Sequence, residues 1–279
     1  MNYKTILVHV DQSRHAAARI GYAAALARAH GAHLIGAAMT GLPRTVFGDG
    51  EWPLPASLAA SCFAPLYDNA SRALEQFAGI AADYQISHEK RLVTDQDAEA
   101  LVRAARFCDL VVITQDDPHE ALPGQVALLP DHVALNATAP VLVMPLDWTA
   151  PAPPNHVLLA WNGSIASTRA VHAALPLLRH AASVRLATFC GDAEPFADQG
   201  AFEQPQLAAS LARHGIEVLA CLRAREADAG QAIMALATGT GCDLVVMGCY
   251  GHARFREILL GGATRTMLRT AALPVLMRH

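Results

Sequence analysis

Short, continuous hydrophobic runs alternate with longer helical stretches along the whole chain. In the second half, the hydrophobic runs lie near residues 156–161, 184–189, 216–222, 244–247 and 274–277. Helical stretches lie between them, near residues 167–179, 206–213, 231–238 and 265–270. Runs that are aliphatic throughout, without alternating polar positions, are typical of strands buried on both faces. Short buried strands separated by helices predict a parallel, doubly wound sheet.

The same plan occurs twice in the chain. Residues 6–13, Ile-Leu-Val-His-Val-Asp-Gln-Ser, resemble residues 157–164, Val-Leu-Leu-Ala-Trp-Asn-Gly-Ser. Two later pairs of segments also match, and residues 242 and 273 each follow their counterparts, 108 and 139, by 134 positions. An internal repeat of this length predicts two copies of one α/β domain.

A proline-rich segment at residues 145–154 separates the two copies. Its prolines disfavour helix and sheet hydrogen bonding and favour an extended connector. We therefore predict two domains, residues 1–146 and 155–279, each with a five-stranded parallel sheet flanked by helices. A Gly- and Pro-rich excursion at residues 41–55 is compatible with a lid, an interdomain contact or a plain connector.

Composition supports two stable domains and narrows the possible functions. The 279 residues are 53% hydrophobic and 16% charged, which is enough apolar material for a core on both faces of each sheet. The net charge of −4 and the lack of a dense basic stripe argue against nucleic acid as a partner. The first hydrophobic run, residues 6–10, is too short for a signal sequence or a membrane span, so we expect a cytoplasmic protein with no membrane partner.

Cysteine and histidine do not form a metal motif in the sequence. The six cysteines include no Cys-x-x-Cys pair and are interpreted as reduced, structural residues. His30 and His33 are close in sequence, but the connection between a helix and a strand is a poor platform for two converging imidazoles. We therefore predict no metal site.

A glycine-rich segment follows the fourth strand of the second copy. The chain there reads Gly248-Cys-Tyr-Gly251, and Gly261-Gly262 precede the last helical stretch. Ligands bind beyond the carboxyl ends of parallel strands, where glycines allow positive φ and a close approach of backbone N–H groups to an anion. The start of a helix also favours phosphate. This segment is a candidate phosphate-binding loop, and the alternative is a tight turn followed by an ordinary helix end.

The first copy has none of these glycines. At the offset of 134 residues it contains Thr114, Asp117, Ala127 and Leu128. Because the same fold is expected without the glycines, we infer that packing does not require them, which favours a binding role. Asp116 and Asp117 would also repel a triphosphate in the first copy.

The spacing of Gly248, Gly251 and Gly261, with two and then nine intervening residues, resembles the signature of nucleotide-binding universal stress proteins. Nearly all of both halves resembles a tandem member of that family. The resemblance implies two Rossmann-like or flavodoxin-like domains, of which the second binds ATP, with or without Mg²⁺. Two positions depart from the family pattern: Gly262 stands where the signature has Ser or Thr, and Asn162 stands where Asp is usual.

The same resemblance implies a set of ligand-facing residues in the second copy. Ala160, Trp161 and Asn162 would face the adenosine, Phe189 and Met247 would lie near the base, and Gly262, Ala263 and Thr264 would lie near the phosphates. His252, Arg254 and Arg256 are candidates to add positive charge to the phosphates, or to form a solvated helix face. The first copy keeps Asp11 but lacks the glycines, so the resemblance implies a degenerate site there.

Three functions remain open. The favoured hypothesis is an ATP-binding regulatory protein of the stress response, with no catalytic residues. The second is an enzyme that hydrolyses ATP slowly, although the sequence contains no Walker motif and no His-x-Gly-His turn after its first strands. The third is an interaction module without a ligand. The resemblance also implies contacts through the last strands, residues 140–144 and 274–277, either between the two halves or in a homodimer.

Overall fold

The computed structural model of the protein describes residues 2–42, 56–120, 128–150, 153–190, 199–224, 226–250 and 262–279. The first half contains β1 (Thr5–Val10), α1 (Ala16–His30), β2 (His33–Met39), α2 (Ala56–Asp83), β3 (His88–Val93), α3 (Asp97–Ala104), β4 (Leu110–Thr114), α4 (Leu129–Asn136) and β5 (Val141–Met144). The second half contains β6 (His156–Ala160), α5 (Ile165–Leu178), β7 (Ser183–Cys190), α6 (Gln199–Arg213), β8 (Val218–Ala224), α7 (Ala229–Gly239), β9 (Leu244–Gly248), α8 (Gly262–Thr270) and β10 (Val275–Arg278).

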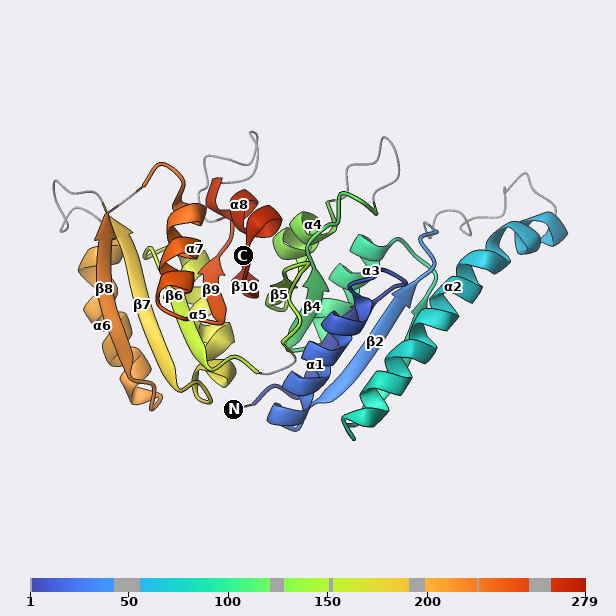
Figure 1. Cartoon of the computed structure of the whole chain (residues 1–279), viewed down its shortest axis with the longest axis horizontal. Coiled ribbons are helices and arrows are strands. Elements are labelled where there is room, and N and C mark those ends of the chain that lie inside the picture. The colour runs from blue at the N-terminus through green and yellow to red at the C-terminus, as the bar shows by residue number, and fades with distance from the viewer. Residues whose placement is uncertain are drawn as a thin grey trace.

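The predicted α/β fold is confirmed, with the strands joined in one continuous sheet. Their order is β3-β2-β1-β4-β5-β10-β9-β6-β7-β8. All pairs within each half are parallel, and the halves meet where β10 pairs with β5 in the antiparallel direction. Figure 1 shows the two halves on either side of this junction. The contact predicted for the last strands is therefore made within the chain.

Helices cover both faces of the sheet, so its central strands are buried on both sides. One core cluster joins residues of α1, α2, α5 and α6 to alternate strand residues, and the other does the same for α3, α4, α7 and α8. Each cluster contains residues of both halves. Burial on two faces explains why the strands read as unbroken aliphatic runs in the sequence.

Helix α6 begins earlier than the sequence predicts. The expected start was residue 206, immediately after Pro205, whereas the helix starts at Gln199 and includes that proline. Proline removes one helical hydrogen bond, but Leu207 and Leu211 of the same helix bury their side chains in the core. None of the helices in the described ranges combines the length and apolarity that crossing a bilayer requires.

A second contact between the halves lies at the ends of α1 and α5. The His30 ring packs 5.1 Å from the rings of both Tyr3 and His180, and the Tyr3 hydroxyl donates to the Ala173 carbonyl at 2.8 Å. His30 is 4% exposed, and its Nδ1 has no hydrogen-bond partner among the described residues. Burial, with a smaller contribution from His180, lowers the pKa of His30 from 6.5 to about 4.

The junction strand should hold both halves together. Leu276 is fully buried on β10 opposite Leu142. Replacing Leu276 with Ala should lower the free energy of unfolding by about 2–5 kcal/mol. Leu219→Ala, at a side chain on β8 that is 60% exposed, is the control and should change it by less than about 0.5 kcal/mol. Urea unfolding followed by circular dichroism measures both, and equal effects would contradict a junction role for Leu276.

The buried His30 should make stability depend on pH. The pKa of His30 is lower in the folded state than in the unfolded state, where it is 6.5. The contribution of His30 to the free energy of unfolding is therefore complete above pH 6.5 and is lost as the pH falls toward about 4. His30→Phe keeps a ring but removes the titration. Between pH 7.5 and pH 5 the wild type should therefore lose about 2 kcal/mol more of its unfolding free energy than the variant. The exposed His214→Gln control should behave like the wild type, and a His30→Phe variant that also does so would refute the prediction.

Candidate functional site

Three neighbouring strands of the second half bring apolar side chains together where β6 ends. Ala160 on β6 pairs with Ala187 on β7 and with Met247 on β9. Ala160, Ala187 and Met247 belong to one buried cluster on the α7 and α8 side of the sheet, and the half-buried Phe189 packs against it. The structure thus places Ala160, Phe189 and Met247 on one face of the sheet, and their contact with an adenine base stays a prediction.

Trp161 lies on the opposite face. Its side chain is in the core cluster that contains Ala170 and Val171 of α5, and only 5% of the residue is exposed. The indole Nε1 donates to Thr168 Oγ1 at 3.3 Å. Strand residues alternate between faces, so the Trp161 side chain points away from the face of Ala160, and a contact of residue 161 with an adenosine would have to use its main chain. Its main chain stays at the strand end, where its N–H donates to the Ala187 carbonyl at 3.0 Å.

The turn after β6 is built by hydrogen bonds to side chains. The exposed Asn162 accepts the Ser164 N–H through Oδ1 at 3.2 Å, and Ser164 Oγ caps α5 by accepting the Ser167 N–H at 3.1 Å. Gly163 has a φ of 75°, in the left-handed region that favours glycine. In the first half, Asp11 forms the same turn with the Ser13 N–H at 3.0 Å. Asn162 therefore reproduces the turn of Asp11 without its negative charge.

Two glycines that the sequence analysis did not identify let helices approach this region closely. A Cβ on Gly200, at the start of α6, would lie 2.8 Å from the carbonyl carbon of Asn162. A Cβ on Gly230, at the start of α7, would lie 2.7 Å from the Thr266 Cβ of α8. Asp228 caps α7 and also accepts the Thr266 hydroxyl at 3.0 Å, so α7 and α8 are fixed to each other. Nothing in the local pattern marks these glycines, because their neighbours are distant in sequence.

Gly248, at the end of β9, is required by packing. A Cβ there would lie 2.4 Å from the Ser167 nitrogen and 2.6 Å from the Ala166 carbonyl carbon of α5. The inference that packing needs none of the loop glycines is therefore wrong at this position. In the first half the corresponding Thr114 is accommodated differently, since its hydroxyl accepts a hydrogen bond from Arg19 of α1.

The segment after β9 is held against the first half. Cys249 is 1% exposed, and its Sγ lies 3.6 Å from the Ala134 carbonyl of α4. Tyr250 has a φ of 55°, and its hydroxyl donates to the Asp131 carbonyl of α4 at 3.2 Å. The predicted site residues Gly251, His252, Arg254 and Gly261 lie outside the described residues, as does Arg256.

Helix α8 begins at Gly262, where the described chain resumes. Gly262 is exposed, and no described atom lies within 4 Å of the position that a Cβ would occupy. Ala263 is half-buried against the same apolar cluster as Met247, and Thr264 is 4% exposed. The N–H groups of this first helical turn have no partner within the helix itself, which makes them available to an anion.

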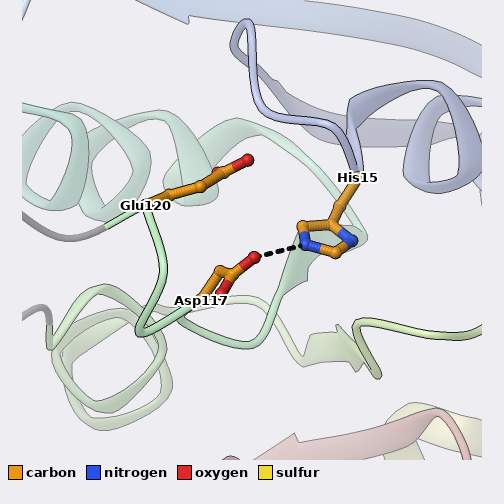
Figure 2. A group of neighbouring side chains, drawn as sticks. All are labelled: His15, Asp117 and Glu120. Atoms are coloured by element: carbon orange, nitrogen blue, oxygen red, sulfur yellow. Dashed lines mark hydrogen bonds and ion pairs between the residues drawn. The ribbon is translucent and has the colours of Figure 1, made fainter.

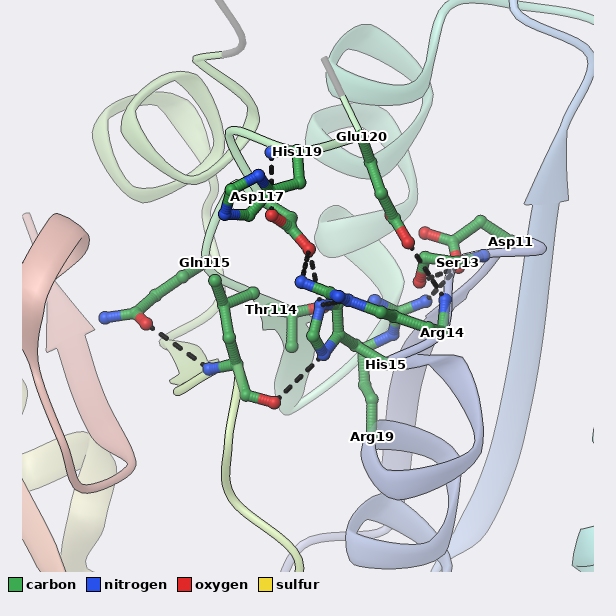
Figure 3. A network of polar contacts seen from close by, with 11 residues as sticks. Asp11, Ser13, Arg14, His15, Arg19, Thr114, Gln115, Asp117, His119 and Glu120 are labelled. Carbon is green, nitrogen blue, oxygen red and sulfur yellow. Dashed lines mark hydrogen bonds and ion pairs between the residues drawn. The ribbon is translucent and has the colours of Figure 1, made fainter.

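The first half fills the equivalent region with charged side chains (Figure 3). His9 occupies the position that corresponds to Ala160 and is only 3% exposed. The buried Arg19 donates through Nε to the His9 carbonyl at 2.8 Å and through Nη2 to Asp11 Oδ1 at 2.7 Å. Burial opposes ionisation of Asp11, but Arg19 and His9 hold its pKa well below the usual range. The first half therefore keeps the fold while an ionised network takes the place of small residues.

Comparisons with known proteins agree with this architecture of two doubly wound α/β halves. A universal stress protein from Archaeoglobus fulgidus is 14% identical over 98% of this chain and 97% of its own, with a TM-score of 0.74. A functionally unknown protein from Pseudomonas aeruginosa is 13% identical over 99% and 92%, with a TM-score of 0.61. The universal stress protein from A. fulgidus in complex with dAMP is 18% identical over 51% and 98%, with a TM-score of 0.37. No curated protein sequence matches the chain significantly.

The model of the universal stress protein family matches residues 154–279. The second half therefore belongs to the universal stress protein family, and the whole chain has the fold of a tandem universal stress protein. The resemblance inferred from the repeated strands and the glycine spacing is confirmed.

The two described glycines of the candidate site should respond differently to substitution. Gly248→Ala should destabilise the protein by about 1–3 kcal/mol, because its methyl group collides with the α5 backbone. Gly262→Ala should not destabilise it, since the added methyl group meets open space at a helical position. Urea unfolding of both variants measures the difference, and a Gly248→Ala protein as stable as Gly262→Ala would contradict the close contact with α5.

Proposed function

We propose that this protein is an ATP-binding regulatory protein of the stress response, with the nucleotide held in the second half. The observation that carries the proposal is the contrast between two halves of one fold. At matching strand ends the second half has Ala160 and Gly248, whereas the first has His9 and Thr114, together with the buried Arg19. At Ala160 the second half thus leaves apolar surface where the first half places the buried His9 side chain, whereas the space beside Gly248 is taken by α5.

Each part of an adenine nucleotide has a chemical counterpart at these strand ends. The face formed by Ala160, Phe189 and Met247 is apolar and suits the flat base. Asn162 is exposed and can both donate and accept hydrogen bonds with ribose hydroxyls. The start of α8, at Gly262, offers unpaired N–H groups and the positive end of a helix dipole to phosphates.

The remaining predicted ligand contacts complete this proposal. Gly251 and Gly261 would cradle the phosphates through their backbone N–H groups, and His252 and Arg254 would add positive charge. Since Cys249 and Tyr250 contact α4, nucleotide at the adjoining loop would act on the junction between the halves. A change in that junction is how binding would be signalled to a partner, without catalysis by the protein itself.

Installing the first half's residues in the second should abolish nucleotide binding. Ala160→His places a bulky side chain against the base, and Gly251→Asp places a negative charge beside the phosphates. Each should weaken ATP binding at least about tenfold, measured by isothermal titration calorimetry. Millimolar ATP should raise the melting midpoint of the wild type but not of these variants, because a ligand stabilises only the state that it binds.

The matched control is His9→Ala, which makes the converse change in the first half. It should leave ATP affinity and a stoichiometry of one per chain unchanged. If His9→Ala removed binding while Ala160→His did not, the nucleotide would have to lie in the first half, and the proposal would be wrong. A wild-type protein whose melting midpoint does not respond to ATP would also refute it.

A further inference from the structure

Three side chains with metal-binding groups meet in the first half, at His15, Asp117 and Glu120 (Figure 2). One imidazole nitrogen and two carboxylate oxygens from these residues all lie within 4.8 Å of one another. We propose that they form a binding site for a divalent transition-metal ion, for which Zn²⁺ is the best chemical match. This site is separate from the proposed nucleotide site and does not depend on it.

The orientation of His15 suits a metal ligand. Its Nδ1 lies 2.9 Å from the Leu146 carbonyl, which can only accept a hydrogen bond, so Nδ1 carries a hydrogen. Nε2 then faces the two carboxylates. A carbonyl that fixes one ring nitrogen while the other binds the ion is the usual arrangement of metal-binding histidines. Leu146 lies in the connector between the halves, outside the cluster, so this contact is independent of the carboxylates.

Asp117 is placed to share a cation with His15. Its side chain is 2% exposed, and its Oδ2 lies 2.8 Å from His15 Nε2. Oδ1 accepts the His119 N–H at 2.9 Å, which fixes the orientation of the carboxylate. Two lone-pair atoms at 2.8 Å need a proton or a cation between them. Tetrahedral zinc bonds of about 2.0–2.2 Å separate neighbouring ligand atoms by about 3.4 Å, so binding would move these two side chains apart by roughly 0.6 Å.

Arg14 already places a positive charge against the same atoms (Figure 3). Its Nη2 lies 2.6 Å from Asp117 Oδ2, and its Nε lies 3.1 Å from His15 Nε2. The Arg14 side chain is 60% exposed, so it can swing into solvent when an ion takes its place. Glu120 accepts the Arg14 backbone N–H at 3.1 Å, which keeps the glutamate directed toward the cluster without using both of its oxygens.

The ligand types favour zinc over the common oxygen-seeking ions. Ca²⁺ and Mg²⁺ prefer sites made entirely of oxygen, whereas Zn²⁺ binds histidine together with Asp or Glu. The set also belongs to the first half alone. At corresponding positions the second half has Ala166, Gly251 and Arg254, which include no metal-binding side chain. The sequence-based expectation of no metal site fails to consider this set because His15 and Asp117 are 102 residues apart.

Zinc titration of the full chain, freed of metal with a chelator and monitored by competition with a chromophoric zinc indicator, tests the proposal. The wild type should bind one Zn²⁺ at this site, and Zn²⁺ should raise its melting midpoint. Glu120→Gln changes an exposed side chain and should weaken binding at least about tenfold without unfolding the protein. His15→Ala should remove the site, with circular dichroism to confirm folding.

Two further variants separate a metal site from a purely structural network. Arg14→Ala removes the competing cation and should tighten Zn²⁺ binding several-fold, whereas a network that only stabilises the fold predicts no gain. His33→Ala deletes an exposed histidine 3.8 Å from Glu89 and should leave the affinity unchanged. Glu120→Gln and Arg14→Ala proteins that both bind zinc like the wild type would overturn the proposal, as would loss of the bound ion in His33→Ala.

Discussion

The antiparallel pairing of β5 with β10 is the constraint on which the rest of the structure depends. Each half ends in a strand whose second neighbour belongs to the other half, so neither sheet is complete alone. The pairing also brings α4 and α8 together, and the residues that directly follow β4 and β9 contact the opposite half. Gln115 Nε2 donates to the Met267 carbonyl of α8 at 3.4 Å and to the carbonyl of Ala271, just after α8, at 3.2 Å. Cys249 and Tyr250 in turn contact α4. The residues that follow both strands therefore lie at the junction between the halves.

Much of the fold could be predicted from local patterns in the sequence. Buried parallel strands leave unbroken aliphatic runs, and the repeat at a fixed offset identifies two copies of one domain. The grouping of Ala160, Phe189 and Met247 follows from the resemblance to universal stress proteins, and the three side chains share one face of the sheet. The side chain of Trp161 and the packing role of Gly248 could not be predicted, because both depend on how closely α5 approaches the sheet. Distances between elements far apart in sequence leave no local signal.

The two halves show how one backbone supports different chemistry at the same place. The second half has small residues at its strand ends. In the first half the buried Arg19 forms hydrogen bonds with residues at the ends of β1 and β4. That arginine holds α1 by side-chain hydrogen bonds, while Gly248 allows α5 to make direct backbone contact. The first half thus lacks the glycine and has the buried arginine. In each half this residue determines how the neighbouring helix is attached to the sheet.

The order of the strands also limits how copies of this protein can assemble. Among the strands of the described ranges, β3 and β8 form the two edges of the sheet, and β3 displays the charged run Glu89-Lys90-Arg91. Charged side chains on an exposed edge oppose the addition of another strand, which protects the sheet from growing into a filament. Because β5 and β10 already have partners on both sides, a second molecule could reach them only by exchanging an entire half. A second molecule that pairs strand to strand would therefore have to use an edge, and β8 lacks the charged run of β3.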